Sequence, residues 1–183
     1  SETQFDLLKE VSCQNVSDSM LSPELSILGD KLSHTENERG EKDEDVIYLK
    51  KYYSLLQVKD YLLSKKLAEK CGALKKPVFI IYFYSNKGDC DDCTKEGYVL
   101  TRLKEKYPEL RVYSFDYDLD LSVIDSHKAI FRIKAAPLPA LVIEDKTYTG
   151  FKSVEELEAL LPDTLKEATV ATSTTATTSK KSK

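Results

Sequence analysis

The sequence predicts an α/β domain in which helices flank a mixed β-sheet, preceded by a helical extension. Residues 77–84 form one continuous apolar, β-branched and aromatic run, which is typical of a central strand buried on both faces. From residue 46 onward, helical and extended patterns alternate, which favours a parallel β-α-β unit. Two short strand patterns at residues 140–144 and 146–151 surround Asp145 and predict an antiparallel hairpin at the edge of the sheet.

Composition divides the chain into three parts. Residues 1–45 are expected to form an N-terminal extension of short helices, and residues 34–45 a charged, solvated linker because they lack apolar side chains. Residues 46–162 carry the patterns of the folded domain. Residues 163–183 are rich in Thr, Ser, Ala and Lys with little to bury, and we expect a disordered tail.

Composition also limits the function classes. The chain has 183 residues, 41% of them hydrophobic, and a net charge of −4, which does not favour a general nucleic-acid binder. No stretch approaches the roughly 18 apolar residues that span a bilayer. The chain begins at Ser1, so we expect any membrane attachment to depend on an anchor absent from this chain. An extracytoplasmic location is slightly favoured over a cytoplasmic one.

The first helix of the domain is expected at residues 46–70. Apolar side chains recur there three, four or seven positions apart, which predicts an amphipathic helix, and Gly72 fits a C-cap. Its tyrosines are expected to pack on the sheet while its lysines face solvent. The residues concerned are Tyr48, Tyr52, Tyr53 and Tyr61, with Lys50, Lys51 and Lys59.

The turn at residues 85–89 leads from the central strand to Cys90, where a second helix is expected to begin and to run to Tyr107. Further elements complete the expected domain. They are a strand at residues 110–117, a helix at 121–133, the hairpin, and a short last helix opened by the capping-box spacing of Ser153 and Glu156.

The segment around the cysteine pair resembles the thioredoxin superfamily. A hydrophobic strand leads into Cys-Asp-Asp-Cys at 90–93, and Leu138-Pro139 precedes a hairpin that closes on Gly150. The resemblance covers about residues 75–161 and implies a thioredoxin-like three-layer sandwich. In that family the proline is cis and lies opposite the cysteines, and the residue before it offers its backbone to an extended substrate. By position these are Pro139 and Leu138.

A helix N-terminus favours a thiolate, and two intervening residues hold the second sulfur close enough to form a disulfide. Cys90 is therefore expected to be the exposed attacking thiol and Cys93 the resolving one. No organic cofactor is expected, because the cysteine pair itself is the redox group. A structural disulfide or a chance pair remains an alternative. A metal site is another, although no further Cys or His lies nearby in sequence.

Two departures from the family pattern bear on the chemistry. The carboxylates of Asp89, Asp91 and Asp92 are expected to disfavour the Cys90 thiolate and so raise its pKa. Destabilising the thiolate favours the disulfide, which predicts a reductant or a mild isomerase. The family's buried acid on the preceding strand has no match. That stretch carries Ile81, Tyr82 and Phe83.

The sequence thus predicts a thiol–disulfide oxidoreductase that acts on protein disulfides, most simply as a reductant. Its expected partners are a protein substrate with a disulfide or thiol and an electron-donating reductase or membrane partner. The alternative is a non-catalytic thioredoxin-fold interaction module that binds a partner protein through its N-terminal helices. Cys13 and Cys71 are expected to be ordinary thiols, with a mutual or intermolecular bridge as the alternative.

Overall fold

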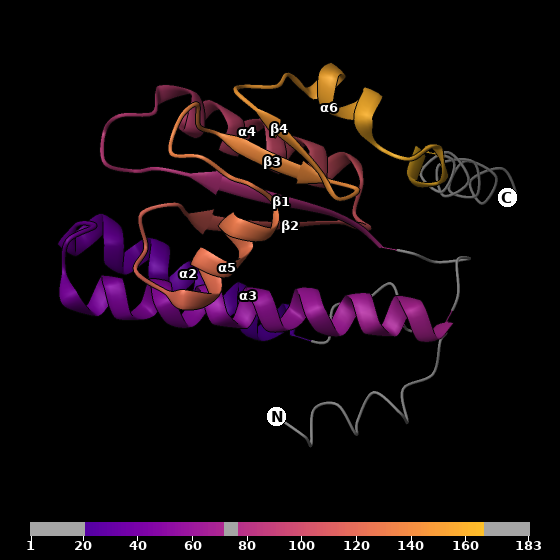
Figure 1. The fold of residues 1–183 in the computed structure, drawn as a ribbon. Coiled ribbons are helices and arrows are strands. Elements are labelled where there is room, and N and C mark those ends of the chain that lie inside the picture. Colours follow the sequence, from indigo (N-terminus) through magenta and orange to yellow (C-terminus); the bar gives the residue numbers. More distant parts are fainter. Residues whose placement is uncertain (1–20, 72–76, 167–183) are drawn as a thin grey trace, which may run out of the picture.

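The structure is a computed structural model that describes residues 21–71 and 77–166. Two helices lead into alternating strands and helices (Figure 1). In chain order the elements are α2 (Ser22–Arg39), α3 (Glu44–Cys71), β1 (Val78–Tyr84), α4 (Asp91–Lys106), β2 (Leu110–Asp116), α5 (Ser122–Ile130), β3 (Ala140–Ile143), β4 (Lys146–Thr149) and α6 (Val154–Leu160).

The strands form one mixed four-stranded sheet in the order β2-β1-β3-β4. Strand β1 pairs in parallel with β2 and antiparallel with β3, and β3 and β4 form the hairpin. The α/β class, the mixed sheet and the central position of the apolar strand are therefore confirmed. Because Phe83 pairs with Ala140, the end of β1 and the start of β3 lie at the same edge of the sheet.

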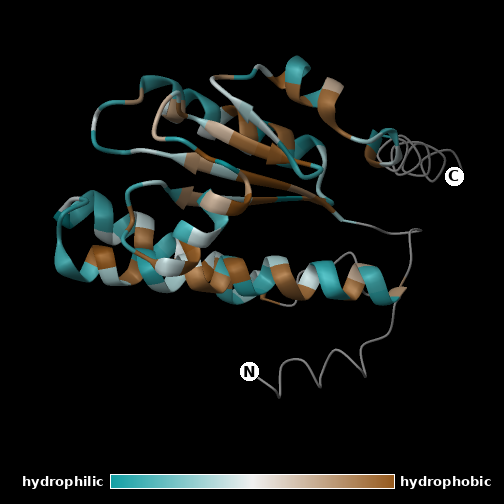
Figure 2. Ribbon diagram, in the orientation of Figure 1, coloured by the Kyte–Doolittle hydropathy of each residue, from teal (hydrophilic) through white to brown (hydrophobic). Residues whose placement is uncertain are grey.

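Helices cover both faces of this sheet. Side chains of a strand alternate between its faces, so Ile80 and Tyr82 pack toward α4 and α6, whereas Ile81 and Phe83 pack toward α3 and α5. In Figure 2 the central strands contain brown residues, and brown and teal residues alternate along α3. The hydrophobic core thus lies in two layers, one on each side of β1.

The expectation of a linker at residues 34–45 is wrong for its first half, which belongs to helix α2. The polar run at residues 34–45 is helical as far as Arg39, and residues 40–43 alone connect α2 to α3. Gly40 ends α2 with a φ of 85°, a conformation that glycine adopts at little steric cost. Glu and Arg are good helix formers, and packing against α3 adds tertiary support that the polar sequence did not reveal.

Helix α3 packs against both α2 and β2, and its buried face differs from the expected one. Tyr53 packs against Gly29 of α2, and Tyr61 lies in the core beside β1 and β2. Tyr48 and Tyr52, by contrast, are exposed, and Lys50 is only 5% exposed. The expectation that all four tyrosines pack on the sheet and all the lysines face solvent is therefore wrong, because polar side chains of α3 find partners on β2.

The remaining expectations have mixed outcomes. The Ser153–Glu156 capping box is present and opens α6. The expectation of a disordered tail is wrong for residues 163–166, which are helical, with Leu165 packed in the core. Cys71 is not a free thiol but is disulfide-bonded. Gly72, Cys13 and residues 167–183 lie outside the described residues.

Within the described residues, none of the helices combines the length and the apolar character needed to cross a membrane.

Candidate functional site

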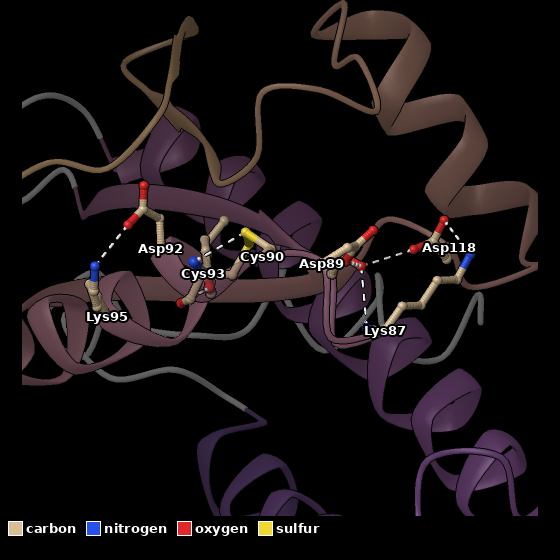
Figure 3. The surroundings of a disulfide bond; sticks show 9 residues. Lys87, Asp89, Cys90, Asp92, Cys93, Lys95 and Asp118 are labelled. Carbon is tan, nitrogen blue, oxygen red and sulfur yellow. Dashed lines mark hydrogen bonds and ion pairs between the residues drawn. A yellow bond between two sulfur atoms is a disulfide. The ribbon is translucent and has the colours of Figure 1, made fainter.

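Cys90 and Cys93 form a disulfide at the start of α4, with their Cα atoms 5.3 Å apart. Cys90 is the N-cap residue and is partly exposed, whereas Cys93 lies one turn inside the helix and is 3% exposed. The Cys90 Sγ accepts a hydrogen bond of 3.1 Å from the backbone N–H of Cys93 (Figure 3). One sulfur therefore faces the surface and the other faces the interior.

Local sequence explains why the helix begins here. Asp91 and Asp92 occupy its first turn, where carboxylates interact favourably with the helix dipole and with free N–H groups. The inward residues of α4 then follow at helical spacing. They are Cys93, Glu96, Leu100 and Leu103.

The three aspartates expected to tune the pair are all exposed and have different neighbours. Asp92 pairs with Lys95 at 3.1 Å, and the Asp89 carboxylate accepts a hydrogen bond of 2.7 Å from the Ser85 hydroxyl. In Figure 3 these two aspartates lie on opposite sides of the disulfide. Asp91 has no ion-pair partner among the residues that the structure describes. The immediate surroundings of Cys90 therefore keep negative charge.

Leu138 and Pro139 lie at the edge of the sheet from which β1 leads to Cys90. Pro139 is buried and directly precedes β3, and its carbonyl accepts a hydrogen bond of 2.8 Å from the Gly150 N–H. Leu138 is partly buried against the core on the α3 and α5 side. The Leu138–Pro139 peptide bond is cis, as is Ala136–Pro137. The topology thus places these residues and the cysteines at one edge of the sheet.

A groove of about 390 Å³ lies beside the disulfide. Both cysteines line it, so the partly exposed sulfur of Cys90 borders open space. The other lining residues come from the end of β1, the following loop and the first turns of α4. They are Tyr82, Tyr84, Ser85, Asn86, Gly88, Asp91, Thr94 and Gly97.

Glu96 is a buried acid on the helix of the site that sequence reasoning missed. It follows Cys93 by one turn on the same face of α4 and is fully buried. One carboxylate oxygen accepts a hydrogen bond of 2.8 Å from the Lys152 N–H, and Oε1 has no hydrogen-bond partner among the described residues. Burial raises the pKa of Glu96 from 4.5 to about 7. A single sequence signal was available, namely a glutamate in the inward-facing row of α4.

Tyr82 is hydrogen-bonded to the backbone of the buried cysteine. Its hydroxyl donates a hydrogen bond to the carbonyl oxygen of Cys93. Burial raises the pKa of Tyr82 above its ordinary value, and the nearby Glu96 carboxylate raises it further. The tyrosine therefore remains protonated at neutral pH and keeps its role as a donor beside the buried cysteine.

The described residues contain no cluster of three or more His, Cys, Asp and Glu side chains arranged to hold a metal ion. Comparison with known proteins gives no assignment, because no family model, curated protein or solved structure matches this chain.

Proposed function

We propose that this protein catalyses thiol–disulfide exchange with protein substrates through Cys90 and Cys93, on a thioredoxin-like fold. The observation that carries the proposal is the asymmetry of the pair. Cys90 borders a groove at the N-terminus of α4, and Cys93 is buried one turn further along. An exposed attacking thiol and a shielded resolving thiol are what stepwise exchange requires.

The proposed reduction of a substrate disulfide takes two steps. The Cys90 thiolate attacks one substrate sulfur, which forms a mixed disulfide and releases the other substrate sulfur as a thiolate. The Cys93 thiolate then attacks the Cys90 sulfur, which releases the second substrate thiol and forms the Cys90–Cys93 disulfide. Two electrons pass to the substrate, and an external dithiol reductant must reduce the pair again.

Glu96 is the proposed proton acceptor for Cys93 in the second step. The Cys93 thiol must lose its proton in a buried environment, which burial alone disfavours. A carboxylate with a pKa of about 7 can accept that proton near neutral pH, and its Oε1 is free of other hydrogen bonds among the described residues. This group replaces, from the following helix, the acid that the resemblance implies on the preceding strand.

The surrounding charge favours the reductive direction. Carboxylates next to Cys90 disfavour its thiolate, and a destabilised thiolate makes the dithiol the stronger reductant. Leu138 and Pro139, at the same edge of the sheet, are proposed to border the substrate-binding surface. No organic cofactor takes part in these steps.

Insulin reduction tests the proposal directly. With dithiothreitol as the electron source, the protein should accelerate insulin precipitation, and Cys90→Ser should abolish the acceleration. The control is the double variant Cys13→Ser/Cys71→Ser, which removes the other cysteines and should keep activity. Unchanged insulin reduction by Cys90→Ser would show that the catalytic assignment is wrong.

One observation favours the alternative of an interaction module. Helix α3 exposes a row of apolar side chains at Tyr48, Tyr52, Leu55 and Leu62, with exposures from 40% to 71%. These residues recur three, four or seven positions apart, so they share one face of the helix. A protein that binds a partner through this face and lacks redox activity would be unaffected by Cys90→Ser, whereas Tyr52→Ser would weaken the complex.

A further inference from the structure

The loop between β1 and α4, residues 85–89, is bonded to the helix α2 that precedes the domain. The Asn86 side chain donates a hydrogen bond of 2.9 Å to Oε1 of Glu36 on α2. The same oxygen lies 3.0 Å from the ammonium of Lys50 on α3. Lys50 is 5% exposed, so this ion pair is largely shielded from solvent. Glu36 thus joins both N-terminal helices to the loop that leads to Cys90.

A second set of contacts reaches the same loop from the end of β2. Asp116 lies 3.4 Å from the Lys50 ammonium and accepts a hydrogen bond of 3.0 Å from the backbone N–H of Asp118. The Ser85 hydroxyl lies 3.2 Å from the Asp118 carboxylate and 2.7 Å from the Asp89 carboxylate, so its single proton is shared between the two. Polar contacts therefore lead from Glu36, by way of Lys50 and the end of β2, to Asp89, the residue before Cys90.

The conformation of Cys90 depends on this loop. As the N-cap residue, Cys90 must leave the loop with non-helical backbone angles, which are φ −143° and ψ 82° here. Only then does its Sγ face the N–H of Cys93. In the reduced protein a Cys90 thiolate held in the same geometry would accept this hydrogen bond and be stabilised by it. A loop free to move would hold this geometry for less of the time.

We propose that Glu36 is a positioning residue for the redox site: through Asn86 and Lys50 it holds the loop in the conformation that directs the Cys93 N–H at the Cys90 sulfur. Helix α2 then contributes to the conformation of the redox site. The inference rests on the proposed function for its biological meaning, but its physical content concerns the Cys90 thiol alone.

The test measures the rate at which iodoacetamide alkylates Cys90 in the reduced full-length protein, from pH 5 to pH 10, by site-resolved mass spectrometry. Glu36→Ala and Asn86→Ala should each move the midpoint upward by about half a pH unit, which slows alkylation at pH 7 about threefold. Glu36→Gln keeps an acceptor oxygen for both partners and should stay within about 1.5-fold of the unmodified protein.

The matched control is Glu38→Ala, because Glu38 is exposed on the same helix and pairs with His34 at 3.4 Å. It should leave the profile unchanged. In the double variant Glu36→Ala/Asn86→Ala the effect should not exceed that of Glu36→Ala alone, since Glu36→Ala already removes the contact with Asn86. Asn86 is exposed, so its variant is expected to fold, and circular dichroism checks this.

An unshifted profile in Asn86→Ala and Glu36→Ala would overturn the inference, even if the melting temperature falls. An equal shift in Glu38→Ala would overturn it as well. These results are separable from failure of the proposed function. If the protein reduces insulin but the profiles coincide, the positioning role alone is wrong. If insulin is not reduced but the profiles shift, the positioning role stands without the catalytic one.

Discussion

At the scale of single residues, the buried carboxyl of Glu96 is the least expected feature of the protein. A buried carboxyl group is stable mainly in its neutral form, because removal from water penalises the charge. The backbone N–H of Lys152 and the charge of that lysine partly compensate, whereas the nearby carboxylates of Glu156 and Asp92 add to the rise in pKa. Glu96 therefore links folding stability to pH in the range where the proposed proton transfer takes place.

Glu96→Gln should remove this linkage. Between pH 4.5 and about pH 7 the native protein holds a proton on Glu96 that the unfolded chain releases. The free energy of unfolding must therefore fall as pH rises through this interval. From pH 5 to pH 8 we expect the oxidised protein to lose about 2 kcal/mol more than the Gln variant.

Urea unfolding of both proteins at pH 5 and pH 8 measures this difference. Glu105→Gln, an exposed position on the same helix, is the control and should follow the unmodified protein. Equal losses in Glu96→Gln and the unmodified protein would show that Glu96 is ionised in the fold.

The two cysteines should behave differently when replaced singly. Cys93→Ser keeps the attacking thiol but cannot complete the second step, so we expect a stable mixed disulfide between Cys90 and insulin. Cys90→Ser leaves a buried thiol, 3% exposed in the oxidised protein, that substrate cannot reach. Non-reducing electrophoresis should therefore detect a covalent complex in Cys93→Ser alone, and a complex of equal yield in Cys90→Ser would reverse the assigned roles.

At the scale of secondary-structure elements, Gln57 of α3 completes the outer edge of β2. Its side-chain amide donates to the Ser114 carbonyl at 2.9 Å and accepts from the Ser114 N–H at 2.8 Å. These are the backbone groups that a neighbouring strand would otherwise satisfy. Tyr113 adds a further bond from the same strand to Asp60 at 2.6 Å. Polar contacts thus add to the apolar packing of Val58 and Tyr61 that attaches α3 to this part of the sheet.

Gln57→Ala should lower the free energy of unfolding strongly, although it removes only a few atoms. It leaves a backbone donor and an acceptor unpaired at a position that is largely shielded from water, which costs about 2–3 kcal/mol of unfolding free energy. Lys59→Ala, an exposed change on the same helix, should cost less than about 0.5 kcal/mol. Denaturant unfolding at pH 7 compares the two, and similar losses would mean that water satisfies Ser114 once Gln57 is removed.

These elements also show what sequence can and cannot predict. The apolar run of β1, the hairpin and the Ser153–Glu156 cap were predictable because each depends on residues close together in the chain. The buried Lys50 was not, since its partners Glu36 and Asp116 come from distant segments. The helical end of α2 could not be predicted for the same reason: its sequence is polar, and the packing of α3 beside it supports the helix.

The candidate site, too, could be predicted from the sequence only in part. The motif at 90–93 predicted the paired sulfurs and their different exposure, because both follow from the geometry of one helical turn. The proposed roles of Glu96 and Asn86 depend on burial and on contacts with Lys152 and Glu36, which lie far away in sequence. Spacing alone carries no information about such contacts.

At the scale of the whole molecule, charge is unevenly placed around the proposed site. Besides Glu36, four aspartates lie beside Cys90 or its loop: Asp89, Asp91, Asp92 and Asp118. Lys95 pairs with Asp92, and Lys87 pairs with Asp118. Asp91, which lines the groove, has no such partner among the described residues. A substrate that approaches Cys90 therefore meets negative potential, which favours positively charged segments.

We expect the protein to reduce a peptide disulfide flanked by lysines faster than the same peptide flanked by glutamates. One charge pair at about 8 Å with an effective dielectric constant of about 60 contributes about 0.7 kcal/mol, or about threefold in kcat/KM. Asp91→Asn should reduce the preference, and raising the salt concentration from about 0.05 M to about 0.5 M should nearly abolish it. A peptide flanked by serine gives the uncharged reference. Equal kcat/KM for the lysine and glutamate peptides at low salt would show that the carboxylates act on the Cys90 sulfur and not on the choice of substrate.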